Sequence, residues 1–341
     1  MKNSSTRFRL GNRWVGEGES CFVIAEAGVS HFGSEEKAFQ LIDLAIDARA
    51  DAVKFQIYDV DTMISKESPE WKARLGSRAL PLSVFRTLKN YCKERNIVFL
   101  VTAHDEVGLE ILIDLNVDGY KFGSGEVSNW PFILRVASLG KPIILSTGMY
   151  SFQDVKHVVD LVRRAGNPDL ALLHCVTQYP TPVQQVNLRV MELYRSSFGG
   201  VVGYSDHTAG YHVPLAAVAL GAHIIEKHIS LDFNVPNAQD WKVSCGPHNL
   251  KLFIEELRET ELALGLPEKV VSSEETLNKE WACKSIVLLV DKMAGDTISE
   301  QDVIFKRPGT GIAPSRLNEV VGKSVRKYFA KDSVLQWEHI K

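Results

Sequence analysis

Short runs of β-branched and other apolar residues alternate with longer amphipathic stretches along most of the chain. The runs have the length of strands, and the stretches between them repeat apolar residues every three to four positions, as one face of a helix does. This alternation is typical of parallel strands joined by crossover helices. The predicted strands cover residues 22–27, 52–57, 97–102, 119–122, 142–147, 171–176, 201–204 and 222–227.

The predicted helices lie between these strands. They cover residues 35–49, 82–95, 106–115, 131–139, 152–164 and 188–196, and a last helix covers 249–264 before Pro267. Eight strand-helix units in about 245 residues match the size of a (β/α)8 barrel. An open doubly wound sheet has fewer strands and a G-x-G-x-x-G first turn, whereas this turn reads AEAGVSHFG. We therefore predict an α/β fold with a (β/α)8 TIM barrel over residues 1–267.

The pattern changes after Pro267 to short strands and turns rich in glycine and proline. We predict a linker over residues 268–282 and a small β-rich domain over 283–341. About 60 residues form a small core, so this domain is expected to pack on the barrel or on another subunit. The connection over residues 58–81 is also longer than the usual two to six residues of a βα loop, and such loops are commonly functional.

Composition and charge narrow the range of partners. The chain has 39 Lys and Arg against 42 Asp and Glu, and this net charge of −3 lacks the basic excess that nucleic-acid binding needs. The N-terminus has no apolar signal-peptide core, and no apolar run approaches the roughly 18 residues of a membrane span. The five scattered cysteines fit reduced thiols. We expect a cytoplasmic protein with no nucleic-acid or membrane partner.

Polar side chains gather where the predicted strands end, which in a TIM barrel is where active sites form. One such residue alone is commonly a solvated strand end or a hydrogen-bonded core group, but here nearly every strand has them. Lysines with hydroxyls and glycine-flanked backbone supply donors for a phosphorylated, carboxylated small molecule. These strand ends carry Glu26, Lys54, Gln56, Thr102, His104, Lys121, Ser124, Glu126, Ser146, Thr147, His174, Thr177, Gln178, Ser205, Asp206, His207, Glu226, Lys227 and His228.

Two histidines follow the last two predicted strands. His207 and His228 lie on neighbouring strands and can meet at one point, and two imidazoles suit a divalent transition ion whose other ligands are water and substrate. Asp206 and Glu226 are further ligands or groups that orient the imidazoles. The alternative interpretation is that each histidine is an ordinary hydrogen-bonded core residue.

The segments IAEAGVSHFG, AVKFQ, YKFGSGE, KPIILSTGM, LLHCVTQYPTP, GYSDHT, IIEKHISLD and KRPGTGI occur in this order from about residue 10 onward. Together they resemble the N-acetylneuraminate (sialic acid) synthase family. Members join a (β/α)8 barrel to a C-terminal antifreeze-like (SAF) domain and form domain-swapped homodimers. The resemblance implies condensation of phosphoenolpyruvate with an open-chain N-acetylated hexosamine, such as N-acetylmannosamine, to a nine-carbon 2-keto acid and phosphate. It also implies a divalent metal, Mn²⁺ or Mg²⁺.

The resemblance also implies roles for individual residues. The phosphate and carboxylate of phosphoenolpyruvate are held by Lys54, Lys121, Ser124, Ser146, Thr147 and Ser205, and Thr177 replaces an asparagine often found nearby. The metal ligands are His207 and His228. The acceptor sugar contacts Gln56, Glu126, Tyr179 and Asp240, and Arg307 reaches the partner subunit's site to bind the N-acyl group. Glu26 lies close to the reacting carbons, as a general base or as an orienting acceptor for a sugar hydroxyl.

Departures from the family pattern leave the identity of the acceptor sugar undecided. Phe32 stands in a His-Phe-Gly turn where many relatives have His-Asn-Gly, and the loop over residues 237–239 is unusual. Legionaminate, pseudaminate and other nonulosonate synthases share most of the motifs. Two other functions are a Schiff-base aldolase using Lys121 or Lys227 without a metal, and a catalytically silent carbohydrate-binding or scaffold protein. The full set of charged strand ends argues against the silent protein.

Overall fold

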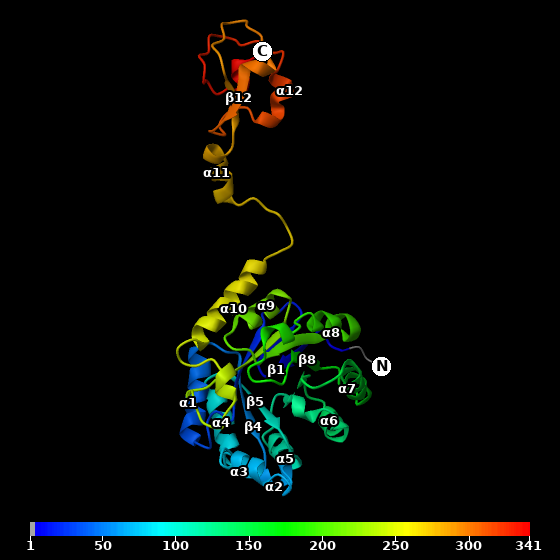
Figure 1. Cartoon of the computed structure of the whole chain (residues 1–341). Helices are drawn as coiled ribbons and strands as arrows, with labels where there is room; N and C mark the ends of the chain where they lie inside the picture. The colour runs from blue at the N-terminus through cyan, green and yellow to red at the C-terminus, as the bar shows by residue number, and fades with distance from the viewer. Residues whose placement is uncertain (1–3) are drawn as a thin grey trace. The chain divides into compact units, whose positions relative to one another are not determined.

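The computed structural model describes residues 4–341, so residues 1–3 of the predicted barrel segment lie outside the described part. The chain divides into two compact units, Met1–Gly265 and Leu266–Lys341. The first unit holds an eight-stranded parallel sheet in the order β5-β4-β3-β10-β9-β8-β7-β6, and β5 and β6 also contact each other (Figure 1). The strands are β3 (Phe22–Gly28), β4 (Ala52–Ile57), β5 (Val98–Ala103), β6 (Tyr120–Phe122), β7 (Ile143–Ser146), β8 (Leu170–Cys175), β9 (Val201–Asp206) and β10 (Ile224–His228).

Sequential strands are neighbours and the last pairs with the first, as in a (β/α)8 barrel. The predicted fold class is thereby confirmed, with each strand end within about two residues of its predicted place. Helices lie around the outside of the sheet (Figure 1). They are α1 (Glu35–Asp47), α4 (Val84–Glu94), α5 (Glu106–Asp114), α6 (Trp130–Ala137), α7 (Phe152–Arg164), α8 (Val190–Phe198), α9 (His212–Ala219) and α10 (Leu250–Leu264).

Local sequence explains several helix boundaries. The Ser34 side chain accepts a hydrogen bond from the Lys37 amide at the start of α1, and Ser151 and Asp154 form a capping box that begins α7. Helix α9 was not predicted, because its sequence HVPLAAVA is apolar nearly all round and shows no polar face. The long connection after β4 holds two further helices, α2 (Val60–Met63) and α3 (Pro69–Gly76).

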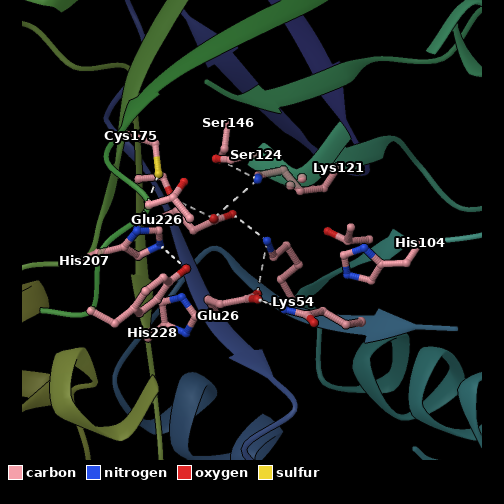
Figure 2. Close-up of a pocket in the computed structure, with 17 residues that line it drawn as sticks. Glu26, Lys54, His104, Lys121, Ser124, Ser146, Cys175, His207, Glu226 and His228 are labelled. Carbon is pink, nitrogen blue, oxygen red and sulfur yellow. Dashed lines mark hydrogen bonds and ion pairs between the residues drawn. The ribbon is translucent and has the colours of Figure 1, made fainter. Parts of the chain in front are cut away.

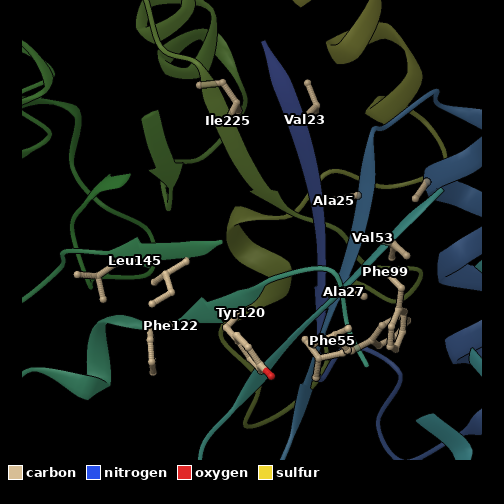
Figure 3. Packing of buried hydrophobic residues seen from close by; sticks show 14 of the residues in the cluster. Val23, Ala25, Ala27, Val53, Phe55, Phe99, Tyr120, Phe122, Leu145 and Ile225 are labelled. Carbon is tan, nitrogen blue, oxygen red and sulfur yellow. The ribbon is translucent and has the colours of Figure 1, made fainter. Parts of the chain in front are cut away.

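Alternation along the strands divides their side chains between two environments. Val23, Ala25 and Ala27 of β3 point outward and pack with Val53 and Phe55 of β4 in the layer between sheet and helices (Figure 3). The residues between them face the barrel interior. Phe22, Ile24 and Ala52 belong to a separate apolar cluster inside the amino end of the barrel.

An antiparallel N-terminal hairpin completes this interior cluster. Strands β1 (Arg7–Leu10) and β2 (Arg13–Gly16) bring Phe8, Leu10 and Val15 against the inward-facing strand residues. Gly119 leaves room for the hairpin, because a Cβ there would lie 2.5 Å from Leu10 Cδ1. The hairpin, which was not predicted, fills the amino end of the barrel with apolar side chains and leaves the carboxyl end for polar ones.

The second unit has its own small core. An antiparallel pair, β11 (Ser285–Leu288) and β12 (Val303–Lys306), packs with the short helix α12 (Leu317–Val320) around Ile286, Leu288 and Ile298. The predicted β-rich domain is present, while the predicted linker contains an exposed helix, α11 (Ser273–Ala282), begun by a capping box. Within residues 4–341, none of the helices has the length and apolar character that crossing a membrane requires.

We predict that Leu10→Ala lowers the free energy of unfolding of the barrel unit by about 2–5 kcal/mol, because the fully buried side chain leaves a cavity. The same change at Leu262, which is 81% exposed in α10, should cost less than about 0.5 kcal/mol. Urea denaturation of the full chain, followed by far-UV circular dichroism, compares the two. Equal effects would show that the hairpin does not stabilise the barrel.

Candidate active site

Side-chain alternation decides which strand-end residues enter the barrel. Glu26 is one of the alternate residues of β3 whose side chains face the barrel interior, and Lys54 and Gln56 hold the same kind of position on β4. These inward-facing side chains line a cavity of about 180 Å³ at the carboxyl ends of the strands. Its lining includes the predicted residues Glu26, Lys54, Gln56, Lys121, Ser124, Ser146, Thr177, Tyr179, Ser205, His207 and His228.

A buried ionic network occupies the base of this cavity (Figure 2). The Lys54 ammonium lies 3.3 Å from Glu26 Oε2 and 3.0 Å from Glu226 Oε2. Glu226 also lies 3.4 Å from the Lys121 ammonium. All four side chains are at most 5% exposed. Such charges are retained only when they compensate one another, because removing one partner leaves a buried charge unpaired.

The environment separates the pKa values of the two carboxyl groups. Burial raises the pKa of Glu26 to about 7, although the Lys54 ammonium opposes the shift. Burial also disfavours ionised Glu226, but Lys121 and Lys54 together hold its pKa well below the usual range. Burial lowers the pKa of Lys121 to about 8. Near neutral pH the network therefore carries two ammonium groups, one full carboxylate and one partly ionised carboxyl group, which leaves an excess of positive charge for an anion.

Hydroxyl groups surround the two ammonium groups. Lys121 donates to Ser146 Oγ at 2.7 Å, and Ser205 donates to Glu226 Oε1 at 2.9 Å. Ser124 begins a 3₁₀ turn, and a Cβ at the nearby Gly148 would come within 2.7 Å of its hydroxyl oxygen. The missing side chain keeps these donors accessible. Together they fit the several oxygens of a phosphate or carboxylate.

The two histidines lie at the side of the cavity. Their ring centroids are 5.3 Å apart. His207 Nδ1 contacts the Val176 carbonyl at 2.6 Å, and an Nδ1–H donated there leaves Nε2 as the acceptor for the Tyr179 hydroxyl at 2.9 Å. His228 Nδ1 is buried without a partner among residues 4–341. Burial, reinforced by His207, lowers the pKa of His228 well below its usual value, so this imidazole is neutral.

These features fit a divalent metal bound by two imidazoles, one of which is oriented by a backbone carbonyl. Burial lowers the pKa of His207, but Cys175 and the Val176 carbonyl outweigh this effect and raise the pKa above its usual value, so a metal would compete with a proton there. Within the described chain, no group of three or more His, Cys, Asp or Glu side chains converges on a point. The protein alone therefore offers two ligands, and water or substrate must supply the rest.

Two strand-end residues that were considered for function face away from the cavity. Thr147 donates to the Leu173 carbonyl and lies 3.0 Å from the Tyr194 hydroxyl, outside the barrel wall. Lys227 is buried in an ion pair with Asp206 at 2.5 Å. Both occupy outward positions of their strands, so the structure does not bring Thr147 to the predicted substrate site or offer Lys227 as a nucleophile.

Three predicted acceptor residues also lie outside the cavity lining. Glu126 accepts a hydrogen bond from Asn129 at 2.7 Å, and its other oxygen is 3.9 Å from His104 Nδ1. Asp240 begins a 3₁₀ turn, Asp240–Val243, after the unusual loop. Arg307 belongs to the second unit, where its Nε donates to the Ala282 carbonyl at 2.8 Å.

The cavity also contains residues that sequence analysis left without a substrate role. Glu226 was considered only as a metal ligand or orienting group, yet it pairs with both lysines. Cys175 was counted only among the reduced thiols, and Thr102 and His104 were strand-end residues without an assigned role. Counting every second residue along each strand, starting from Glu26, would have identified these inward positions.

A closed parallel barrel with buried lysines, carboxylates and histidines at its carboxyl end defines an enzyme site for a small anionic molecule. The NeuB family model matches residues 41–269, and the SAF domain model matches residues 284–341. The chain belongs to the NeuB family and carries a C-terminal SAF domain. The family resemblance drawn from the motifs is confirmed.

Individual relatives extend this result over almost the whole chain. An N,N'-diacetyllegionaminic acid synthase of Legionella pneumophila is 37% identical over 95% of this chain and 96% of its own. The human N-acetylneuraminate-9-phosphate synthase is 33% identical over 96% and 95%. A crystal structure of an N-acetylneuraminic acid (sialic acid) synthetase from Leptospira borgpetersenii superposes with a TM-score of 0.75 at 32% identity, covering 82% of this chain and 96% of that one.

We predict that the cavity binds sulfate, whose charge is constant near neutrality, less tightly as pH rises through 8. The Lys121 ammonium loses its proton in this range, and affinity should fall about 10-fold between pH 7 and 9 if only the charged form binds. Titration calorimetry on the metal-free protein measures the dissociation constant. Lys121→Arg should reduce the fall to the part that follows from ionisation of Glu26, and a flat wild-type profile would contradict the assignment.

Proposed function

We propose that the protein condenses phosphoenolpyruvate with the open-chain form of an N-acetylated hexosamine, giving a nine-carbon 2-keto acid and phosphate. The observation that carries the proposal is the network of Lys54, Lys121, Glu226 and Glu26 beside two imidazoles whose ring centroids are 5.3 Å apart. Relatives at 30–37% identity are named as legionaminic, pseudaminic or neuraminic acid synthases, which supports this class of reaction.

The donor substrate, phosphoenolpyruvate, is proposed to bind to two lysines of the cavity. Lys54 and Lys121 bind the phosphate and carboxylate of phosphoenolpyruvate, with Ser124, Ser146 and Ser205 as hydroxyl donors. In the free protein Glu226 engages both ammonium groups, so the donor competes with an internal carboxylate for them. This arrangement keeps the lysines charged and oriented before the substrate arrives.

Carbon–carbon bond formation joins C3 of the donor to the aldehyde carbon of the acceptor, whose oxygen takes up a proton. His207 and His228 would hold a divalent ion, which would supply Lewis-acid polarisation of the aldehyde. Attack leaves positive charge on C2 of the donor, and water adds there. Glu26 accepts the proton of this water, which its pKa of about 7 permits near neutral pH. Cleavage of the bond from C2 to the phosphate oxygen then releases phosphate, and the new C2 hydroxyl group gives its proton to the departing phosphate as the keto group forms.

The acceptor contacts are proposals that follow the family pattern. Gln56 donates to Glu26 Oε1 at 3.1 Å and lines the cavity with Tyr179. Asp240 and Glu126 flank it, and Arg307 would come from the second unit of a partner subunit. N-acetylmannosamine, a diacetamido sugar and other related acceptors all remain compatible with these groups.

Three finer assignments accompany the reaction. We propose Mn²⁺ or Mg²⁺ as the metal, because imidazole with water and substrate oxygens suits such ions. We propose a domain-swapped homodimer, since the family motif containing Arg307 lies in the small second unit. We propose a cytoplasmic location, because all five cysteines are free, as in a reducing compartment.

One observation favours a second function, a Schiff-base aldolase. Burial lowers the pKa of Lys121 to about 8, which increases the fraction of nucleophilic amine. Borohydride reduction in the presence of pyruvate separates the two functions. A covalent adduct on Lys121 would support the aldolase, whereas metal-dependent phosphate release without an adduct supports the synthase.

We predict that Lys54→Met and Lys121→Met each raise the KM for phosphoenolpyruvate by about 10-fold or more and lower kcat, because each removes a charge-assisted contact. Phosphate release with Mn²⁺ across a panel of acetamido sugars measures both constants. Lys156→Met removes an exposed lysine paired with Asp160 and serves as the matched control. A change confined to the KM of the sugar would mean that the two substrates have been placed wrongly.

We predict that His228→Ala abolishes metal-dependent turnover while the barrel stays folded, because one of two protein ligands is lost. His157→Ala on the outer helix α7 is the control, since His157 packs against Trp130 outside the cavity. Activity is measured with added Mn²⁺ and with a chelator. Full activity of His228→Ala in chelator would overturn the metal assignment.

We predict that mixing inactive Lys121→Met and Arg307→Ala proteins restores activity after subunit exchange. If Arg307 acts in trans, each mixed dimer has one site with both defects and one intact site, which gives about a quarter of wild-type activity in a statistical mixture. Native mass spectrometry confirms that mixed dimers form. Background activity in such a mixture would show that Arg307 does not serve the partner's site.

A further inference from the structure

A second cavity lies beside the long connection after β4. It has a volume of about 560 Å³ and separates α3 from the unusual loop that precedes Asp240. The residues that matter for its chemistry are Arg74 and Arg78 on one side, Asn237 on the other, and the exposed Glu70 at its edge. None of these residues has a part in the reaction described above.

The two guanidinium groups are poorly compensated. Arg74 Nε is buried and has no hydrogen-bond partner among residues 4–341, and its guanidinium lies over the Trp71 ring at 5.1 Å. Arg78 donates to the Asn237 carbonyl at 2.8 Å. No carboxylate within the described chain approaches either group to 4.0 Å, Glu70 included. The two neighbouring cations repel each other, the nearby Asp240 carboxyl group offsets this effect in part, and a bound anion would reduce the repulsion further.

The arginine pair lies next to the catalytic cavity. Burial raises the pKa of Asp240, and this shift is opposed by His207, Arg78 and Arg74, which all lie near its carboxyl group. The Tyr58 hydroxyl donates to the Leu75 carbonyl of α3 at 3.1 Å, and its ring centroid lies 6.3 Å from that of His104, which lines the catalytic cavity. A ligand whose reacting end lies at His207 can therefore extend past Asp240 toward the two guanidinium groups.

We propose that Arg74 and Arg78 bind a phosphate group on the end of the acceptor sugar remote from its aldehyde. This inference rests on the proposed condensation, because it assigns the direction of the acceptor from the histidines. Two planar guanidinium groups match a phosphate monoester in charge and in bidentate geometry. A neutral polyol chain would offer the two guanidinium groups only uncharged acceptors, which is why the phosphorylated acceptor is favoured over an unphosphorylated one.

The test uses unreactive acceptor analogues, so that binding is measured without turnover. The alditol of N-acetylmannosamine and its 6-phosphate both lack the aldehyde and cannot be condensed. Titration calorimetry on the full chain should show at least 10-fold tighter binding of the phosphorylated alditol. Arg74→Gln and Arg78→Gln should each reduce this preference about 10-fold. Lys72→Gln is the matched control, because Lys72 lies on the same helix but pairs with Asp61 at 2.6 Å.

Each result decides the inference. Equal affinities for the two alditols, no binding of either, or a phosphate preference that persists in both arginine variants would overturn it. Loss of the preference in both arginine variants and its retention in Lys72→Gln would establish it. Failure of the proposed condensation is seen separately, as absence of phosphate release from phosphoenolpyruvate with every acceptor in the panel.

Discussion

The alternation of side chains along eight parallel strands is the constraint on which the rest of this structure depends. It directs every second side chain of a strand into the barrel. These inward side chains are apolar in the amino half of the barrel and charged or polar in the carboxyl half. Lys54, Lys121 and the two buried carboxyl groups therefore share one small cavity. Because burial weakens solvent screening, each charge shifts the protonation of the others, and the network is prepared to exchange an internal carboxylate for a substrate anion.

The surrounding architecture keeps this network in place. The N-terminal hairpin fills the amino end with Phe8, Leu10 and Val15, while outward-facing strand residues pack under the helices. On the carboxyl side, the 3₁₀ turn at Ser124 and the loop before Asp240 carry polar groups. The rigid sheet thus positions the donor site, and the variable connections are left to distinguish acceptors.

The sequence was sufficient to predict the barrel because its strands are apolar, regularly spaced and separated by amphipathic helices. It did not reveal the hairpin, whose alternation is short, or α9, which has no polar face. The polar residues at the predicted strand ends identified most of the cavity lining. They did not distinguish Glu226, which faces inward, from Lys227, which faces outward, until the strand register was known. The position of Arg74 depends on how α3 packs within the long connection, and that of Asp240 on the loop after β10, neither of which local sequence patterns encode.

The central claim is that the coupled lysines and carboxyl groups form the anion site, and proton uptake on binding tests it most directly. Phosphoenolpyruvate bound at pH 8 should raise the pKa of Lys121 and draw about half a proton from solution, because half of the ammonium groups are deprotonated before binding. Calorimetry in buffers of different ionisation enthalpy measures this uptake. We predict uptake in the wild-type protein and its loss in Lys121→Arg. Tight binding without proton uptake in the wild-type protein would contradict the account.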